Sequence, residues 1–292
     1  MDSATQDISP LRRRMIDDMR MRKLADKTRS GYIRVVQQFT GFLGRSPDTA
    51  TVEDLRRYQL HLVDHGTSPV SLNAAITGLK FFFEVTLDQG DLMTKMQPVR
   101  VPQTLPVVLS RPEVGAILKC VRVPVYRVCL QTIYSCGLRI SEAVGLQVGD
   151  VDSQRMVLRV RGKGNKERQV PLAQPTLAAL RQLWKTHRSR PWLFPQGLRP
   201  HWGARTAGPI QAQNVRRAFQ LARLQSGVTK PACMHSLRHS YATHLLEAGV
   251  QLLLIQEILG HRSPRTTTIY THLTDQVRAQ VIGPVQALVQ DL

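Results

Sequence analysis

Two patterns of hydrophobic and polar positions divide this chain of 292 residues. In roughly the first 90 residues, apolar side chains recur every three or four positions, which is the spacing of amphipathic helices. The capping residues agree, because Asp54 stands three residues after Thr51 and Pro69 suits a first helical position. The pattern predicts a bundle of four short helices: Leu11 to Leu24, Lys27 to Leu43, a third from Thr51, and a fourth from Ser68 to Phe83.

The helical pattern stops near Gly90, and a second domain begins after Pro106. The stretch between them contains Pro98, Pro102 and Pro106 and has little periodicity, which predicts an extended linker. The predicted division is therefore an N-terminal helical domain over residues 1–90, a linker over 91–106, and a second domain over 107–292.

The second domain changes its period once. Ser110 and Glu113 have the spacing of a capping box at a helix start. Residues 156–161 then alternate in polarity, and residues 168–172 follow as a return strand after a turn rich in Gly, Lys and Asn, which predicts a β-hairpin. The remaining segments read as helices: 123–135, 138–146, 175–187, 212–225, 235–248, 251–259 and a stretch from Pro264 onward. The fold is predicted to be mainly α with a small β-hairpin or sheet.

The balance of charged residues indicates what kind of partner the protein binds. Lys and Arg number 40 against 21 Asp and Glu, which gives a formal net charge of +19. Residues 1–100 hold 15 basic and 12 acidic side chains, and residues 101–292 hold 25 and 9, so most of the excess lies in the second domain. An excess of this size favours a nucleic-acid partner.

The remaining composition favours a cytoplasmic protein. The four cysteines form no CxxC pair and predict reduced thiols. The N-terminus lacks the pattern of a signal peptide, and no apolar run is long enough to span a bilayer, so no membrane association is expected.

Two motifs combine glycine with basic residues. In Gly137-Leu138-Arg139-Ile140-Ser141-Glu142, an arginine at a helix start precedes a carboxylate on the same face, which suits an anion site. In Gly162-Lys163-Gly164-Asn165-Lys166-Glu167-Arg168, a turn carries two lysines that could approach a phosphate backbone. Taken singly, each fits a plainer interpretation, namely an exposed ion pair and a solvated hairpin tip.

Two further motifs contain titratable groups. His235 and Arg238 lie three residues apart, hence on one helical face. Tyr270 follows His261 at the end of Gly260-His261-Arg262-Ser263-Pro264, a turn that leads into a short predicted helix. A metal site from Cys233, His235 and His239 is disfavoured, since neither a CxxC pair nor an H-E-x-x-H motif is present.

Together and in this order, the motifs resemble the signature boxes of tyrosine recombinases. The segments that carry the resemblance are G-L-R-I-S-E, R-G-K-G-N-K-E-R-x-V-P-L, H-S-L-R-H-S-Y-A-T-H-L-L and L-G-H-R-S-P-R-T-T-T-I-Y-T-H-L. The chain is similar to Xer-type and to transposon- or phage-borne integrases over nearly its full length. Residues 194–234 match only loosely, and no large insertion of the integron type is present.

The resemblance implies a role for each motif residue. Arg139 and Arg238 would clamp the scissile phosphate, and Lys163, rather than Lys166, would protonate the leaving 5′ oxygen. His235 and His261 would hydrogen-bond the phosphate and assist proton transfer. Glu142 would hold the site together from behind. Tyr270 would attack phosphorus and form a 3′-phosphotyrosine link, with neither metal nor ATP.

The resemblance also implies an architecture and an assembly. A SAM-like core-binding domain and a mixed α/β catalytic domain would form a C-shaped clamp on double-stranded DNA with specific recombination sites. Four copies would act on two duplexes, with or without a partner recombinase. The apolar stripe of residues 274–292 would dock on a neighbouring copy, although a helix folded back on its own domain is the simpler alternative.

Two other functions fit parts of the sequence. Residues 245–259 have the pattern of a helix-turn-helix, which would suit a non-catalytic DNA-binding regulator. A type IB-like topoisomerase would share the tyrosine chemistry but relax DNA at any sequence. The biological role among transposition, integration and dimer resolution stays open at this level.

Overall fold

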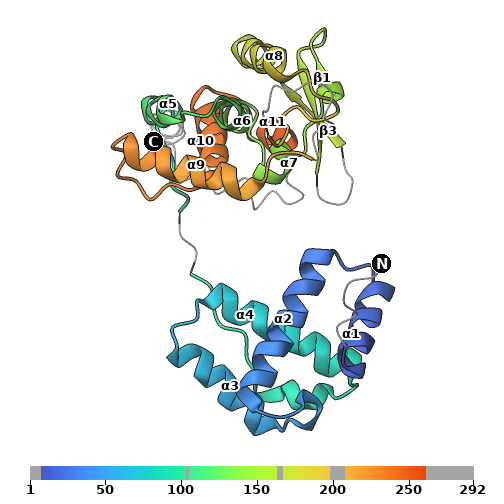
Figure 1. Ribbon diagram of the computed structural model, residues 1–292. Helices are drawn as coiled ribbons and strands as arrows, with labels where there is room; N and C mark the ends of the chain where they lie inside the picture. The colour runs from blue at the N-terminus through green and yellow to red at the C-terminus, as the bar shows by residue number, and fades with distance from the viewer. Residues whose placement is uncertain (1–7, 103–104, 163–166, 198–207, 261–292) are drawn as a thin grey trace, which may run out of the picture. The chain divides into compact units, whose positions relative to one another are not determined.

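The structure is a computed structural model that describes residues 8–102, 105–162, 167–197 and 208–260 (Figure 1). The chain divides into two compact units, Met1–Gln103 and Thr104–Leu292, and each is described by itself. Within the described ranges, no helix combines the length and the apolar character needed to cross a membrane.

The N-terminal unit is a bundle of helices, and the four helices expected from the sequence are present. Its helices are α1 (Pro10–Met21), α2 (Asp26–Leu43), α3 (Val52–Asp64) and α4 (Pro69–Lys80), with η1 (Pro47–Thr49), η2 (Phe81–Thr86) and η3 (Gly90–Lys95) as short irregular turns. The expected caps also form, since Thr51 and Asp54 make a reciprocal capping box and Ser68 accepts a hydrogen bond from the Ser71 N–H.

Aromatic rings fill the centre of this bundle. Phe39, Phe82 and Phe83 are almost completely buried, and the Phe39 and Phe83 rings meet edge to face with centroids 6.1 Å apart. Phe82 and Phe83 lie on the π-helical turn η2, which continues α4 without a break and turns both rings into the core.

The segment expected to be an extended linker is partly folded onto the N-terminal unit. Its start forms the 3₁₀-helix η3, and Met93 and Met96 are buried in the N-terminal core. The side chain of Asn73 then exchanges hydrogen bonds with the backbone of Val99. The extended stretch is therefore shorter than expected, because the two methionines in its first part are buried in the core of the N-terminal bundle.

The C-terminal unit combines seven helices and a small sheet among its described residues. They are α5 (Arg111–Cys120), α6 (Pro124–Ser135), α7 (Ile140–Val144), α8 (Gln174–His187), α9 (Ala212–Gln225), α10 (Met234–Glu247), α11 (Leu252–Leu259), β1 (Val151–Asp152), β2 (Val157–Arg161) and β3 (Glu167–Pro171), with the 3₁₀ turn η4 (Val148–Asp150) before β1. The helix expected over 138–146 is shorter in the structure, and α7 begins only after Arg139.

The sheet is antiparallel with strand order β1-β2-β3, so the predicted hairpin of β2 and β3 gains a third, two-residue strand. Leu158 pairs with Val170, and both side chains are buried. Alternation along β3 places Arg168 and Val170 on the same inner face. An arginine on the buried face of a strand needs polar partners inside the protein.

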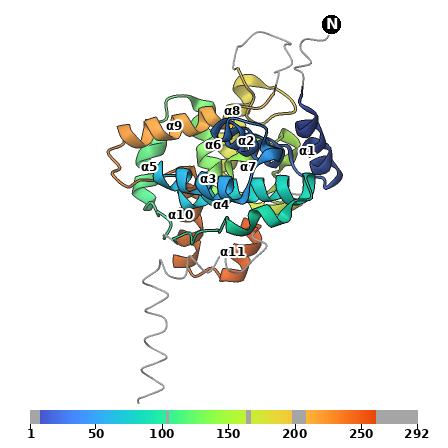
Figure 2. The same cartoon turned by 90° about the horizontal axis from the view of Figure 1, so that it is seen from below.

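Helix α6 lies at the centre of the unit and packs against α8, α9 and α10. Helix α11 packs against α10 and against β3, and Figures 1 and 2 both show it beside α10. Because α7 directly follows α6, these contacts bring the start of α7, the N-terminal part of α10, the end of α11 and the start of β3 to one place.

Candidate active site

Arg238 is buried in the middle of the C-terminal unit, one turn into α10. Its side chain is 3% exposed. Its two terminal nitrogens donate hydrogen bonds to the carbonyl oxygens of Gly137, at 2.7 Å, and of Leu259, at 2.6 Å. The guanidinium thus ties α10 to the turn before α7 and to the last residue of α11.

Arg139 and Glu142 meet at the start of α7. Arg139 is the N-cap residue, and its backbone N–H donates to Glu142 Oε2 at 2.9 Å. The Arg139 side chain returns to the same carboxylate, with Nη1 2.8 Å from Oε1. Arg139 is 36% exposed whereas Glu142 is 3% exposed, so the carboxylate holds the arginine from the protein side.

Glu142 brings three arginines together. Arg238 Nη1 lies 3.8 Å from Glu142 Oε2. Arg168 approaches from β3 and donates to both carboxylate oxygens, at 3.0 and 2.8 Å. The sequence motifs singled out Arg139, Arg238 and Glu142 and missed Arg168. The signal available was its position in β3, on the same face as the apolar Val170.

The arginines keep Glu142 ionised. Burial by itself would raise the pKa of this carboxyl, but hydrogen bonds from Arg168 and from the Arg139 backbone outweigh burial and lower the pKa to about 2. Three guanidiniums against one carboxylate leave an excess of positive charge. Since Arg139 is the exposed member, that charge reaches the surface there.

Two histidines on α10 are held neutral. Burial of part of the ring lowers the pKa of His235, and the positive charges of Arg238 and Arg139 lower it further. Burial and the neighbouring His235 lower the pKa of His239 to about 4. A neutral imidazole beside a cationic site can accept a proton or donate one N–H to a bound anion.

Three of the predicted site residues, Lys163, His261 and Tyr270, lie outside the described residues. The chain on either side of the first is described, since β2 ends at Arg161 and β3 starts at Glu167. The predicted tail over 274–292 also lies outside. Within the parts that the structure covers, no three His, Cys, Asp or Glu side chains gather as metal ligands, and all four cysteines are free thiols.

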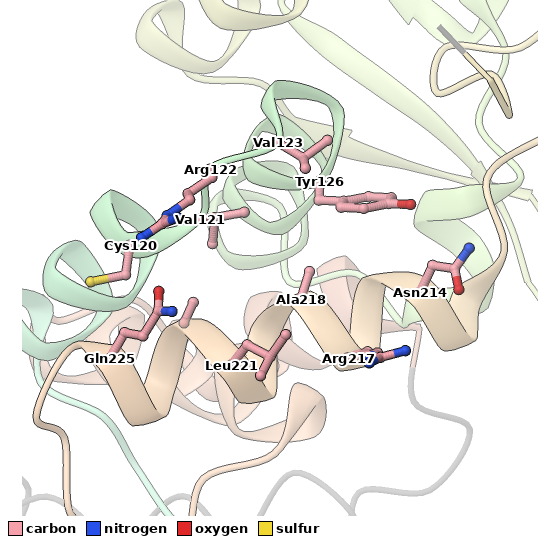
Figure 3. Close-up of a pocket in the computed structure, with 11 residues that line it drawn as sticks. Cys120, Val121, Arg122, Val123, Tyr126, Asn214, Arg217, Ala218, Leu221 and Gln225 are labelled. Carbon is pink, nitrogen blue, oxygen red and sulfur yellow. The ribbon is translucent and has the colours of Figure 1, made fainter.

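A groove lies away from these residues, between α9 and the connection from α5 to α6 (Figure 3). It has a volume of about 400 Å³, and Tyr126, Val123 and Leu221 line it together with Arg122 and Arg217 at its edge. Of the predicted site residues that the structure describes, none lines this groove.

The helices α10 and α11 lack the surface of a DNA-binding helix-turn-helix, the alternative that the sequence offered for residues 245–259. The inner face of α10 is buried, including Arg238 and Ser236. Helix α11 exposes Leu253, Leu254 and Glu257 and has no basic residue. Its outer surface therefore lacks the charge that a recognition helix needs.

Comparison with known proteins gives the family. Residues 108–277 match the profile of the phage integrase family, and residues 11–90 match the phage integrase N-terminal SAM-like domain.

The chain belongs to the phage integrase family.

Its relatives place this integrase among the tyrosine recombinases. A Sinorhizobium fredii protein named as an integrase/recombinase is 41% identical over 96% of this chain and 90% of its own length. Tyrosine recombinase XerC of Alcanivorax borkumensis is 31% identical, covering 89% of this chain and 88% of that protein. The integrase is thus an enzyme that breaks and rejoins DNA.

Solved structures agree with the fold. The XerA recombinase covers 94% of this chain and 98% of its own, with 28% identity and a TM-score of 0.53. A lambda integrase dimer bound to a core site reaches a TM-score of 0.71 at 18% identity, covering 89% of this chain and 93% of that one. The mainly helical fold with a SAM-like N-terminal domain and a small antiparallel sheet is confirmed.

Proposed function

We propose that this integrase is a site-specific recombinase that cleaves double-stranded DNA with Tyr270 as nucleophile and rejoins it to a second duplex. One observation carries the proposal: Arg139 and Arg238 converge on the buried Glu142 and leave an excess of positive charge at an exposed guanidinium. Guanidiniums arranged in this way can bind the two non-bridging oxygens of one phosphate.

The charge distribution fits displacement at a phosphodiester. In-line attack concentrates negative charge on the non-bridging oxygens of the transition state. Guanidiniums stay protonated at all working pH values and need no reorganisation to stabilise that charge. The described arginines therefore offer what the reaction needs without a metal ion, and the chain has no G-x-x-x-x-G-K-[ST] loop for ATP.

The proposed step balances without a co-reactant. The Tyr270 oxygen attacks phosphorus, the bond from phosphorus to the 5′ oxygen breaks, and the 3′-phosphotyrosine bond forms. Lys163 gives its proton to the leaving 5′ oxygen. The tyrosine proton passes to a neutral imidazole, for which His235 and His261 are the candidates. The reverse step, with a 5′ hydroxyl of the second duplex as nucleophile, restores the enzyme.

The proposed assembly is a tetramer on two duplexes, in which each N-terminal and C-terminal domain pair closes as a clamp on DNA. The apolar stripe of residues 274–292 would connect neighbouring copies, and a partner recombinase would be an alternative to self-assembly. Transposition, integration and dimer resolution all use this chemistry.

The test is capture of the covalent intermediate. The full chain is incubated, with chelator, with duplexes that carry one nick and randomised flanking sequence, and adducts are isolated on a denaturing gel and sequenced. We expect adducts from the wild type and from Tyr126→Phe, a control tyrosine away from the arginine cluster, but none from Tyr270→Phe with DNA binding retained.

Each alternative has its own outcome. Adducts of one consensus sequence support the recombinase, whereas adducts at unrelated sequences together with relaxation of supercoiled plasmid would support a topoisomerase. Tight binding with no adduct on any duplex would overturn the proposed chemistry.

A further inference from the structure

Arg168 connects three elements that are far apart in the sequence. It lies on β3, and its side chain is 12% exposed. Its terminal nitrogens bind both oxygens of Glu142 on α7, and its Nε donates to the carbonyl oxygen of Ile258 on α11 at 2.7 Å. One planar group therefore fixes a strand to the start of one helix and to the end of another.

We propose that Arg168 is a positioning residue of the active site. It orients the carboxylate that holds Arg139 and Arg238, and it fixes the end of α11. The inference rests on the proposed function, in which these two arginines bind the scissile phosphate.

The carboxylate geometry is the first part of the argument. Glu142 Oε1 accepts from Arg139 Nη1 and Arg168 Nη1, while Oε2 accepts from the Arg139 backbone and Arg168 Nη2. A fork-shaped guanidinium that binds both oxygens fixes the plane of the carboxylate. Because Arg139 is 36% exposed, the direction of its guanidinium depends on that plane. A lysine in place of Arg168 would keep the charge and lose the fork.

The end of α11 is the second part. Arg168 binds the carbonyl of Ile258 and Arg238 binds that of Leu259, so two of the helix's last free carbonyls have guanidinium partners. Gly260 follows with φ +64°, and a Cβ there would lie 3.0 Å from Arg168 Cδ. The chain that leads on to His261 therefore starts from a point held by both arginines.

The first test compares the same substitution on the two paired strands. Arg168→Lys changes the buried arginine of β3, and Arg161→Lys changes an arginine of β2 that is 47% exposed and pairs with Glu167. On the nicked duplex selected by the wild type, we expect single-turnover cleavage by Arg168→Lys to fall roughly 10- to 100-fold, as for groups that orient metal ligands. The DNA dissociation constant should stay within about twofold, because Arg168 points inward.

The second test reads the carboxylate itself by carbon NMR of labelled glutamate. Glu142 faces Arg139, Arg168 and Arg238, with His235 nearby. In the wild type its signal should not titrate between about pH 4 and 7, whereas Arg168→Gln should bring its titration into that range. Cleavage by Arg168→Gln should then show a new loss at the acid end of its pH profile, which a defect in folding alone would not produce.

A third measurement needs no variant. The Nε–H of Arg168 should exchange slowly with water in the wild type because it is hydrogen-bonded and buried, while that of Arg161, hydrogen-bonded to Glu167 but 47% exposed, should exchange faster. Equal exchange rates, or cleavage by Arg168→Lys at the wild-type rate, would overturn the inference. If the wild type formed no adduct, the proposed function would fail, and the carboxylate signal and the exchange rate would still decide the role of Arg168.

Discussion

The guanidinium of Arg238 donates a 2.6 Å hydrogen bond to the carbonyl oxygen of Leu259, so the N-terminal part of α10 holds the last residue of α11. The same side chain reaches the carbonyl of Gly137 before α7. A residue expected to bind phosphate is therefore also part of the interior, which separates it from its more exposed counterpart, Arg139.

This difference predicts unlike effects of two alanine substitutions. Arg139→Ala should lower adduct formation by about 10²–10³-fold, the cost of losing one donor to a developing oxyanion. Its unfolding free energy in urea should change by only about 1 kcal/mol, because Glu142 keeps both hydrogen bonds from Arg168. Arg238→Ala should lose activity and also about 3 kcal/mol of stability, because two buried carbonyls lose their donor. Equal stability of both variants would contradict the prediction.

Glu142→Gln should be strongly destabilising at neutral pH. The substitution leaves buried guanidiniums without their counter-charge, which costs about 3–5 kcal/mol for a buried pair. Glu53→Gln is the matched control, since Glu53 pairs with Arg56 at the surface with 61% of its side chain exposed, and it should cost less than about 1 kcal/mol. Urea unfolding of the two variants makes the comparison.

The destabilisation should depend on pH in one direction. Because the folded pKa of Glu142 lies near 2, below the ordinary 4.5, its ionised form stabilises the fold above about pH 4.5, and this stability is lost as the pH falls toward 2. The difference in unfolding free energy between the wild type and Glu142→Gln should therefore be constant from about pH 5 upward and shrink below it. A difference that grows on acidification would contradict the assignment.

Gly137 should tolerate no side chain. It has φ +59°, and an added Cβ would lie 2.8 Å from Leu259 Cδ2 and 2.7 Å from Tyr241 Cε1. Gly137→Ala should cost about 2–4 kcal/mol from overpacking and backbone strain. In α5, Gly115→Ala meets nothing within 4 Å and should be neutral or slightly stabilising, because alanine favours a helix. Thermal or urea unfolding distinguishes them.

The imidazole of His235 should be neutral at pH 7 in the free protein. Burial and the charges of Arg238 and Arg139 lower its pKa below the ordinary 6.5, so protonation sets in only below that value. A group of this kind destabilises the fold as the pH falls below 6.5, since the unfolded chain binds the proton more readily. Proton NMR of the ring, with assignment by His235→Gln, checks the midpoint, and a midpoint above 6.5 would contradict the prediction.

Local chemistry explains which elements the sequence could predict. The helix capping boxes at Thr51 and Ser110 each depend on a residue only three positions further along the chain, and both form as expected. The two-residue strand β1 has no period long enough to detect, and it exists only because β2 offers it an edge. The segment around Met93 had the composition of a linker, but two apolar side chains found room in the N-terminal core.

The contacts of the site also divide into those that local sequence spacing predicts and those that depend on tertiary packing. Arg139 and Glu142 are three residues apart and interact as their spacing predicts, within one helix start. Arg168 reaches Glu142 across 26 residues and Ile258 across 90, so its partners depend on the packing of α11 against β3 and not on local order. The roles of Lys163, His261 and Tyr270 stay predictions from the motifs.

The arginine cluster also affects the thermal stability of the protein without bound DNA. Around Glu142, three fixed cations share one anion, so without DNA the folded state contains mutual repulsion that a bound polyanion relieves. A ligand that binds only the folded state stabilises it in proportion to the logarithm of its concentration. The melting temperature should therefore rise with short duplexes of any sequence, which means that a thermal-shift signal alone would report charge neutralisation and not recognition of a recombination site.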